Sequence, residues 1–168
     1  MIANWERIHF RPMHLGDLPL MHRWLNTAHV LEWWDHLPTP DAVAAEYTSR
    51  IQGREPTQSF IVEADARPVG CIQCYRIADY PDYAQYLGAD DHAVGVDLFV
   101  GEAELVGRGL GSAVLREFLR TVVFAYQSPT ECIIGPEIGN HRALVRIKGP
   151  ASATGRPFRF PANEPMNS

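Results

Sequence analysis

Five stretches of the chain have the pattern of a β-strand, either alternating hydrophobic and polar residues or a run rich in β-branched and aromatic residues, which predicts five strands. These stretches cover residues 8–13, 59–63, 68–77, 93–100 and 131–134. The second and third are joined by Ala64-Asp65-Ala66-Arg67, a connection short enough for a hairpin turn. We therefore expect these two strands to be antiparallel neighbours.

Apolar residues recur at helical spacing in four further stretches. The helices are expected over residues 18–25, 40–52 and 112–126, and from residue 141 onward. Asp17 and Asn140 are expected to cap the first and the last of them. The sequence Thr39-Pro40-Asp41 marks the start of the second, because proline fits the first helical turn.

The order of these elements is strand-helix-helix-strand-strand-strand-helix-strand-helix, which predicts one mixed α/β domain. A chain of 168 residues is long enough for one such domain with a hydrophobic core. Residues 80–91 mix turn-forming residues with three tyrosines, so we expect a loop that carries contacts. Periodicity stops at Lys148; the domain is expected over residues 1–147, and the tail over residues 148–168 is expected to be irregular.

The charge of the chain argues against a nucleic-acid partner. The 15 Lys and Arg residues are outnumbered by 20 Asp and Glu, which gives a formal net charge of −5, and the basic residues are scattered. A small cationic molecule suits this balance better than a phosphate backbone. No apolar stretch reaches the roughly 20 residues that span a bilayer, and residues 1–7 lack a signal peptide's apolar run. A cytoplasmic location without a membrane partner is therefore expected.

The spacing of cysteines and histidines predicts no metal site. Cys71 and Cys74 have the spacing of a redox or zinc pair, but Cys132 is the only other cysteine, so no second pair completes a zinc site. The seven histidines show no His-x-His or His-Glu-x-x-His spacing. We expect Cys71 and Cys74 to be buried thiols on a strand.

A glycine-rich sequence, Gly107-Arg108-Gly109-Leu110-Gly111-Ser112, lies between a predicted strand and a predicted helix. Small residues there let a ligand approach the backbone, and the free N–H groups at a helix start favour an anion. The sequence lacks the lysine of a P-loop and the glycine spacing of a dinucleotide-binding fold, which disfavours a nucleotide hydrolase or a dehydrogenase. Taken alone, the glycines are equally well explained by a tight turn.

The sequence around this turn resembles the pyrophosphate-binding segment of the GNAT acyltransferases. The resemblance rests on residues 95–102, which lead into residues 105–111. The usual Q/R-x-x-G-x-G/A pattern has Val106 at its first position here. The aminoglycoside 6′-N-acetyltransferase branch shows the same kind of departure, with leucine at that position, and the role of the backbone N–H groups does not depend on the side chain.

Further matches make the chain similar to this branch. They are Trp24-Leu25-Asn26, His29-Val30, Glu32-Trp33-Trp34, Gly70, Gln73 and Tyr75, and the resemblance covers residues 8–147. The resemblance implies the GNAT fold, a central, mostly antiparallel mixed sheet flanked by helices. It also implies direct acetyl transfer from acetyl-CoA to the 6′-amine of an aminoglycoside or another small polycationic amine, by a monomer or homodimer. Siderophore hydroxylysine acyltransferases share the WLN and WW elements and are the alternative.

The resemblance also assigns roles to single residues. Asp97 lies on the strand that lines the acyl site of this family, where a carboxylate could hold the acceptor ammonium and take its proton. An Asp that only pairs with a neighbour is the structural alternative. The cofactor would be bound by Leu98, Phe99, Val100, Gly107, Arg108, Gly109, Leu110, Gly111, Ser112 and Asn140. Acceptor contacts would come from Trp33, Trp34, Gln73, Tyr75, Asp82 and Glu137, although the two tryptophans suit a core equally well.

The C-terminal sequence departs from this branch. After Asn140 the branch continues as N-x-R-A-I/L-R-x-Y-E-K-A-G-F, and its tyrosine is thought to protonate the departing thiolate; this chain has Ile147 there. Codons compatible with the chain from Leu144 onward can also be read in a shifted frame as R-A-Y-Q-R-A-G-F-R-Y-W-K-T-V-Q-V-P-G-E, which resembles the missing tail. We hypothesise that a one-base deletion near Leu144 has put the tail out of frame, with the closing strands of the fold lost. A chain that binds acyl-CoA without turnover is the third interpretation.

Overall fold

A computed structural model describes residues 5, 7–126, 129–134 and 158–161. The chain groups into two compact units, Met1–Gln73 with Leu98–Gly111, and Cys74–Asp97 with Ser112–Ser168. Strands β3 (Arg67–Arg76) and β4 (Val94–Val100) each begin in one unit and end in the other. We therefore describe each unit separately.

The first unit is built on strands β1 (Ile8–Pro12) and β2 (Gln58–Ala64) and on the first part of β3. Strand β1 pairs with β2 in antiparallel fashion, with Ile8 opposite Ala64. Between β2 and β3, Asp65 and Ala66 have positive φ values of 50° and 66°. Two consecutive positive φ values are typical of a two-residue hairpin turn, so the predicted hairpin is confirmed.

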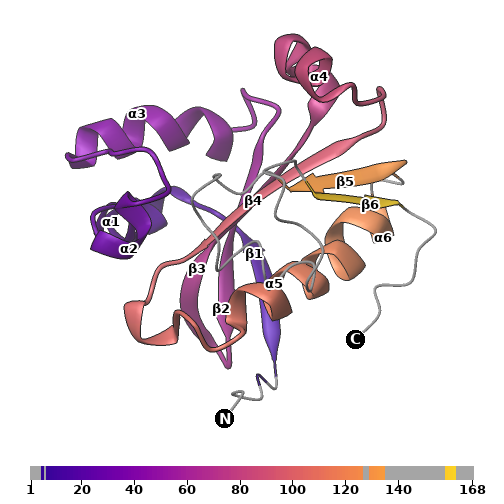
Figure 1. The fold of residues 1–168 in the computed structure, drawn as a ribbon. Coiled ribbons are helices and arrows are strands. Elements are labelled where there is room, and N and C mark those ends of the chain that lie inside the picture. The colour runs from indigo at the N-terminus through magenta and orange to yellow at the C-terminus, as the bar shows by residue number, and fades with distance from the viewer. Residues whose placement is uncertain (1–4, 6, 127–128, 135–157, 162–168) are drawn as a thin grey trace. The chain divides into compact units, whose positions relative to one another are not determined.

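Three helices belong to the same unit, α1 (Leu18–Leu25), α2 (Ala28–Leu31) and α3 (Pro40–Ile51). Helix α3 packs against α1 and β2, and Figure 1 shows the three helices together. The Thr39 hydroxyl accepts a hydrogen bond of 3.1 Å from the Ala42 N–H and so caps α3. Buried side chains of these helices and of the neighbouring strands form one hydrophobic core, which comprises Met13, Met21, Trp24, Leu25, Val30, Val43, Tyr47, Ile61, Cys71 and Phe99.

Asp17 precedes α1 as expected, but its side chain does not cap that helix. Its carboxylate instead accepts two hydrogen bonds of 2.8 Å from Arg11 and one of 2.9 Å from the His14 N–H. Asp17 is only 5% exposed, and a buried carboxylate is stabilised more by the charged Arg11 guanidinium than by the N–H groups at the start of α1. Burial alone would raise the pKa of Asp17, but the hydrogen bonds from Arg11 and His14 outweigh burial and lower it.

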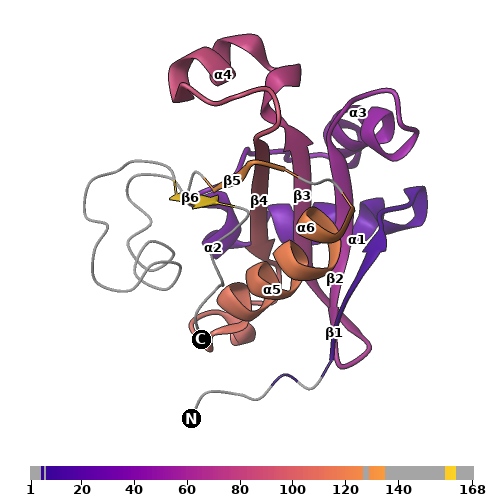
Figure 2. The ribbon, with the colours of Figure 1, turned by 90° about the vertical axis from the view of Figure 1, so that its right-hand side faces the viewer.

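The second unit contains the end of β3, the beginning of β4, and strands β5 (Glu131–Ile134) and β6 (Phe158–Pro161). Strand β4 pairs in parallel with β5, with Val94 opposite Cys132. Strand β6 pairs with β5 in antiparallel fashion and lies beside it in Figures 1 and 2. The periodicity of the tail predicts no strand there, so β6 is an element that the sequence pattern misses. Hydrogen-bonded neighbours follow the order β1-β2-β3-β4-β5-β6, a mixed sheet.

Helix α4 (Pro81–Leu87) stands where a loop was expected, and that expectation is wrong for these seven residues. Pro81 occupies the first turn, and Gly88 ends the helix with a positive φ of 58°. Proline at the start of a helix and glycine just after its end are boundary signals, and in so short a helix they look like turn formers. Tyr83 and Leu87, one turn apart, pack on a core with Ile77.

Helix α5 (Leu110–Phe118) begins two residues before the expected start, inside the glycine-rich sequence. It continues through a π-helical turn (Leu119–Val123) into α6 (Phe124–Tyr126), which gives the continuous helical run in Figure 2. None of the helices that the structure describes combines the length and apolar character needed to cross a membrane. The helix expected from residue 141, together with Asn140, lies outside the described residues.

Candidate functional site

Strand β4 extends beyond its pairing with β5. That pairing covers Val94 and Gly95 among the described residues, whereas β4 continues to Val100. Residues 98–100 therefore lie past the last described partner on β5. An extended ligand can add to such an edge as another strand would, with hydrogen bonds to backbone N–H and C=O groups.

Asp97 follows that pairing by two residues and is half-buried. Within the second unit, the Tyr75 hydroxyl donates a hydrogen bond to the Asp97 carboxylate. Burial raises the pKa of Tyr75, and the negative charge of Asp97 raises it further. Burial and Asp97 also raise the pKa of Tyr83, against a hydrogen bond with Tyr75 that lowers it. Both phenols are therefore neutral hydrogen-bond partners beside the carboxylate at physiological pH.

The backbone just after β4 is held by helices α1 and α2 of the first unit. The His29 Nε2 atom lies 2.8 Å from the carbonyl oxygen of Val100. The Gly101 N–H donates a hydrogen bond of 2.8 Å to the carbonyl of Val69, and a Cβ at Gly101 would lie 2.3 Å from ring atoms of Trp24. This close approach requires glycine at residue 101.

Glu102 anchors the same turn with its side chain, which is almost fully buried. The carboxylate accepts hydrogen bonds of 2.6 Å from Arg23 and 2.9 Å from the indole N–H of Trp24, and it lies 3.2 Å from Arg67. The hydrogen bond from Arg23 is the main reason that the pKa of Glu102 is lowered, against the opposing effect of burial. Sequence reasoning missed Glu102, because an acidic residue after a strand is usually solvated.

The glycine-rich sequence has the backbone of an anion-binding turn. Gly107 and Gly109 have positive φ values of 81° and 85°, which other residues rarely adopt. Helix α5 begins at Leu110, and the first N–H groups of an α-helix are in general not bonded inside the helix. Arg108 is exposed and makes no ion pair with a described residue. These features fit a phosphate group, and they support the expected cofactor contacts.

The expected acceptor contacts belong to both units of the described chain. Trp34 packs on the first core with its ring 4.9 Å from that of Phe99, and it hydrogen-bonds Tyr47, as a core residue does. Gln73 is 8% exposed and accepts a hydrogen bond of 3.3 Å from Arg50. Trp33 is half-buried, and Asp82 is exposed in the first turn of α4. Glu137 lies outside the described residues.

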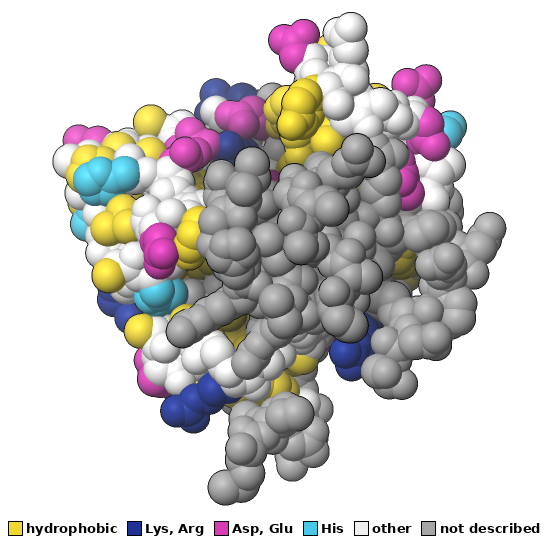
Figure 3. Space-filling view, in the orientation of Figure 1, with side chains coloured by type: hydrophobic (Ala, Val, Ile, Leu, Met, Phe, Trp, Pro, Cys, Tyr) yellow, Lys and Arg dark blue, Asp and Glu magenta, His cyan; other side chains and the backbone are white. Residues whose placement is uncertain are grey.

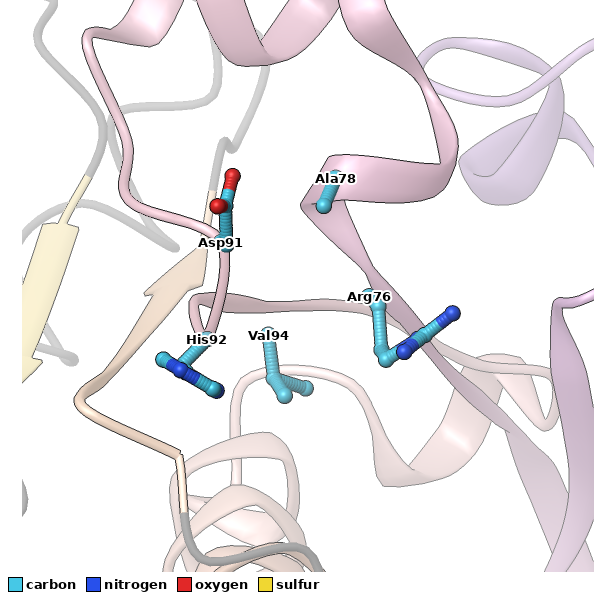
Figure 4. A pocket seen from close by; sticks show the side chains of 5 residues that line it. All are labelled: Arg76, Ala78, Asp91, His92 and Val94. Atoms are coloured by element: carbon cyan, nitrogen blue, oxygen red, sulfur yellow. The ribbon is translucent and has the colours of Figure 1, made fainter.

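A surface cavity of about 420 Å³ lies in the second unit (Figure 4). Its lining residues are Arg76, Ala78, Asp91, His92 and Val94. Successive side chains of a strand point to opposite faces, so Val94 and Asp97 lie on different faces of β4. This cavity is therefore separate from the Asp97 carboxylate.

Most described arginines are already paired with carboxylates. These are Arg11, Arg23, Arg50, Arg67, Arg76 and Arg120. On the part of the surface described in Figure 3, arginine side chains occur in small separate groups. Among the described residues, no three His, Cys, Asp or Glu side chains are grouped to hold a metal ion. The described residues thus offer a carboxylate with two phenols in the second unit, and a strand edge and a glycine-rich turn in the first.

Comparison with known proteins identifies the family to which this chain belongs. The family model described as "Acetyltransferase (GNAT) domain" matches residues 14–159, most of the chain. The chain belongs to the GNAT acetyltransferase family. The expected family is confirmed, and with it the class of enzyme, an N-acetyltransferase.

Two curated relatives of this GNAT chain act on different amines according to their names. It is 26% identical over 142 residues to "Aminoglycoside N(6')-acetyltransferase type 1" of Klebsiella pneumoniae, a match that covers 83% of this chain and 70% of that protein. It is also 26% identical over 121 residues to "N-hydroxyputrescine acetyltransferase" of Acinetobacter baumannii, with 72% of this chain and 56% of that protein covered.

A crystal structure of the aminoglycoside acetyltransferase AAC(6')-Ib with coenzyme A and kanamycin has the same fold. The TM-score is 0.75 at 26% identity, and the match covers 83% of this GNAT chain and 80% of the other. The predicted fold, a mixed sheet flanked by helices, is thereby confirmed. The first relative and this crystal structure relate the chain to aminoglycoside 6′-N-acetyltransferases, which is the branch that the sequence resembles.

Proposed function

We propose that this chain transfers the acetyl group of acetyl-CoA to an amino group of a small polycationic acceptor, with the 6′-amine of an aminoglycoside as the first candidate. One observation carries the proposal. Strand β4 extends beyond its last described partner on β5 and carries Asp97, hydrogen-bonded to Tyr75, just before residues 98–100, whose backbone a ligand strand can join. Family membership supports the reaction class, and the first relative supports the acceptor.

The residues of the site suit acetyl-CoA in two places. Positive φ at Gly107 and Gly109, the start of α5 and the exposed Arg108 suit the diphosphate. The backbone of residues 98–100 suits an extended pantetheine arm, and one of its N–H groups would polarise the thioester oxygen. When bound, the thioester supplies an activated acetyl group.

Asp97 is the group that handles the acceptor proton in this proposal. A carboxylate attracts the acceptor ammonium and accepts one of its protons, directly or through a water molecule, so that a neutral amine can attack the thioester carbon. The C–N bond forms as the C–S bond breaks, and the nitrogen then gives its second proton to solvent. The departing thiolate takes a proton from solvent, since the pKa of an ordinary thiol is about 8.5. This route does not need a tyrosine at the position of Ile147.

A second acceptor class is supported by the relative named for N-hydroxyputrescine. A hydroxylamine nitrogen is largely uncharged at neutral pH, unlike an alkyl ammonium, and therefore depends less on a proton acceptor. Transfer to a hydroxylamine would thus tolerate the loss of the Asp97 carboxylate better than transfer to an amine. Acceptor preference in wild type and Asp97→Asn separates the two classes.

The direct test follows CoA release from acetyl-CoA by the purified 168-residue chain and by a frame-restored chain. Acceptors are kanamycin, an aminoglycoside with a hydroxyl in place of the 6′-amine, and N-hydroxyputrescine. We expect CoA release with kanamycin and none with the aminoglycoside that lacks the 6′-amine. The Asp97→Asn substitution should lower kcat with kanamycin by about 100-fold or more. Absence of release with every acceptor in both chains would overturn the proposal.

A further inference from the structure

Tyr75 of β3 lies across Gly95 of β4, within the second unit. A Cβ atom at residue 95 would lie 2.5 Å from both Cε2 and Cζ of Tyr75, and 2.9 Å from its hydroxyl oxygen. Such distances are far below van der Waals contact, so only glycine at residue 95 lets the ring occupy this place. Gly95 and Asp97 are two residues apart on one strand and therefore face the same side of the sheet.

Two tyrosines from the segment that follows β3 hold the ring of Tyr75 in this place. The ring of Tyr80 meets it edge to face, with centroids 5.4 Å apart. Tyr83 of α4 hydrogen-bonds Tyr75 and packs on the same core. Tyr75 is partly buried, and its hydroxyl reaches the Asp97 carboxylate. The phenol is thus fixed by three neighbours rather than free to follow an acceptor.

We propose that Tyr75 is a positioning residue for Asp97: its ring, seated over Gly95, directs the hydroxyl so that it donates a hydrogen bond to the carboxylate. This inference rests on the proposed role of Asp97 in proton transfer. It differs from the contact with the acceptor that the sequence resemblance implies for Tyr75. The hydroxyl holds the carboxylate in one orientation and stabilises its ionised form.

The ionisable groups near Tyr75 and Asp97 determine which of the two donates the hydrogen bond between them. The ionisable groups that the charge of Asp97 influences are Tyr75 from β3, Tyr83 from α4 and Cys132 from β5. Cys132 is paired with Val94 and therefore lies on the opposite face of the sheet from Asp97. Burial raises the pKa of the Cys132 thiol, with Cys74 and Asp97 as further causes, so the thiol is neutral at physiological pH. Tyr80 and Tyr86 lie around the two phenols, and Glu131 lies near Cys132. Among these groups Tyr75 is the neutral residue whose hydroxyl donates to Asp97 and whose ring is held in place by its neighbours.

The test compares Tyr75→Phe, Gly95→Ala and their double variant with wild type, in whichever of the two chains releases CoA. Tyr75→Phe keeps the ring and removes the hydroxyl, whereas Gly95→Ala keeps the hydroxyl and displaces the ring. We expect each to lower kcat by about 10- to 100-fold with little change in the KM for the acceptor. The double variant should be no worse than the poorer single variant, because both act on one hydrogen bond. Tyr86→Phe is the control, since that tyrosine is 82% exposed on α4.

Two pH measurements separate positioning from a merely structural role. The acidic limb of kcat/KM should move to higher pH in Tyr75→Phe, because the ionised carboxylate loses a donor. The carboxyl carbon of Asp97, followed by NMR with wild-type and Tyr75→Phe protein, should titrate at a correspondingly higher pH without any substrate. A rise in acceptor KM with unchanged kcat and an unmoved limb would overturn the inference, and Tyr75 would then be an acceptor contact.

The same variants distinguish failure of this inference from failure of the proposed function. Full activity in Asp97→Asn would remove the catalytic role of Asp97 and with it the basis of the inference. Loss of activity in Asp97→Asn together with an unchanged pH profile and unchanged NMR titration in Tyr75→Phe would overturn the positioning role alone. If the Gly95→Ala variant does not fold, the Tyr75→Phe variant and the NMR titration still decide whether Tyr75 positions Asp97.

Discussion

The indole N–H of Trp24 donates a hydrogen bond of 2.9 Å to Glu102, two residues after strand β4 ends. Trp24 is fully buried in the first core, so this bond joins that core to the turn that leads into the glycine-rich sequence. The position of the turn therefore depends on packing of α1 as well as on its own backbone. Variants at Glu102 test this dependence.

Glu102→Ala should lower the free energy of unfolding by about 1–3 kcal/mol, because the buried Trp24 N–H loses its acceptor. It should also raise the KM for acetyl-CoA, since the following turn loosens. Glu102→Gln keeps an oxygen acceptor and should lose less stability. The control is Glu104→Ala in the same turn, where the exposed carboxylate pairs with Arg67, and no measurable change is expected. Equal denaturant midpoints for Glu102→Ala and Glu104→Ala would contradict the argument.

Gly107 and Gly53 form a matched pair for testing the glycine-rich turn. Both have positive φ, 81° and 68°, and a Cβ on either would meet nothing within 4 Å. Alanine at each position should therefore cost a similar strain of about 1–2 kcal/mol. Only Gly107→Ala should also weaken acetyl-CoA binding, measured as KM or by calorimetry. Equal effects of the two substitutions on acetyl-CoA binding would argue against a diphosphate site at the turn.

Arg108 is expected to contribute long-range attraction for the diphosphate rather than a rigid contact. Arg108→Ala should raise the KM for acetyl-CoA by about two- to fivefold at low salt, with kcat unchanged. The difference from wild type should shrink as salt is added, because an exposed charge is screened. Arg116→Ala, an exposed arginine further along α5, serves as control. A salt-independent effect, or the same effect at Arg116, would contradict this role.

The ion pair between Asp17 and Arg11 gives a pH dependence with a defined sign. The pKa of Asp17 is lowered from its ordinary value of 3.8 in the folded chain. Its contribution to stability is therefore complete above 3.8 and is lost as the pH falls through the lower folded value. Thermal midpoints of wild type and Asp17→Asn, measured between about pH 6 and pH 2.5, should differ most at the upper end and converge below about pH 4. A constant difference over this range would refute the assignment.

The sequence predicts those helices and strands in which the spacing of apolar residues matches the residues that are buried in the structure. Helix α1 buries Met21, Trp24 and Leu25 on one face. The alternation over residues 8–13 matches β1, in which His9 is exposed between two half-buried residues. Helix α4 is missed because its seven residues are too few to show a period, and only its end residues mark it. Strand β6 is missed because its strand character depends on pairing with β5, which is distant in sequence.

The same distinction applies to the candidate site. Asp97 and Tyr75 were both identified from the sequence, but their hydrogen bond depends on the ring lying over Gly95, a contact between two strands that no local pattern encodes. Tyr83 was assigned to a loop, although its spacing from Leu87 is one helical turn. Glu102 gave no signal, because its role comes from the buried indole of Trp24, which is 78 residues away.

The hypothesis of a shifted reading frame after Leu144 makes the last prediction. Sequencing of the coding DNA should reveal third bases that permit the family-like tail, and restoring one base should produce it. The restored chain should unfold at a higher temperature and more cooperatively, because its closing strands would cover the edge of the sheet over a greater length.

The restored chain should also release CoA faster. Replacing its tail tyrosine by phenylalanine then separates the effect of that phenol from the effect of the strands. Ile147→Tyr in the present chain is the matched control: it supplies the phenol without the family helix around it and should not raise kcat. Equal melting temperatures and equal rates for the present and restored chains would refute the hypothesis and leave Asp97 and solvent as sufficient for proton transfer.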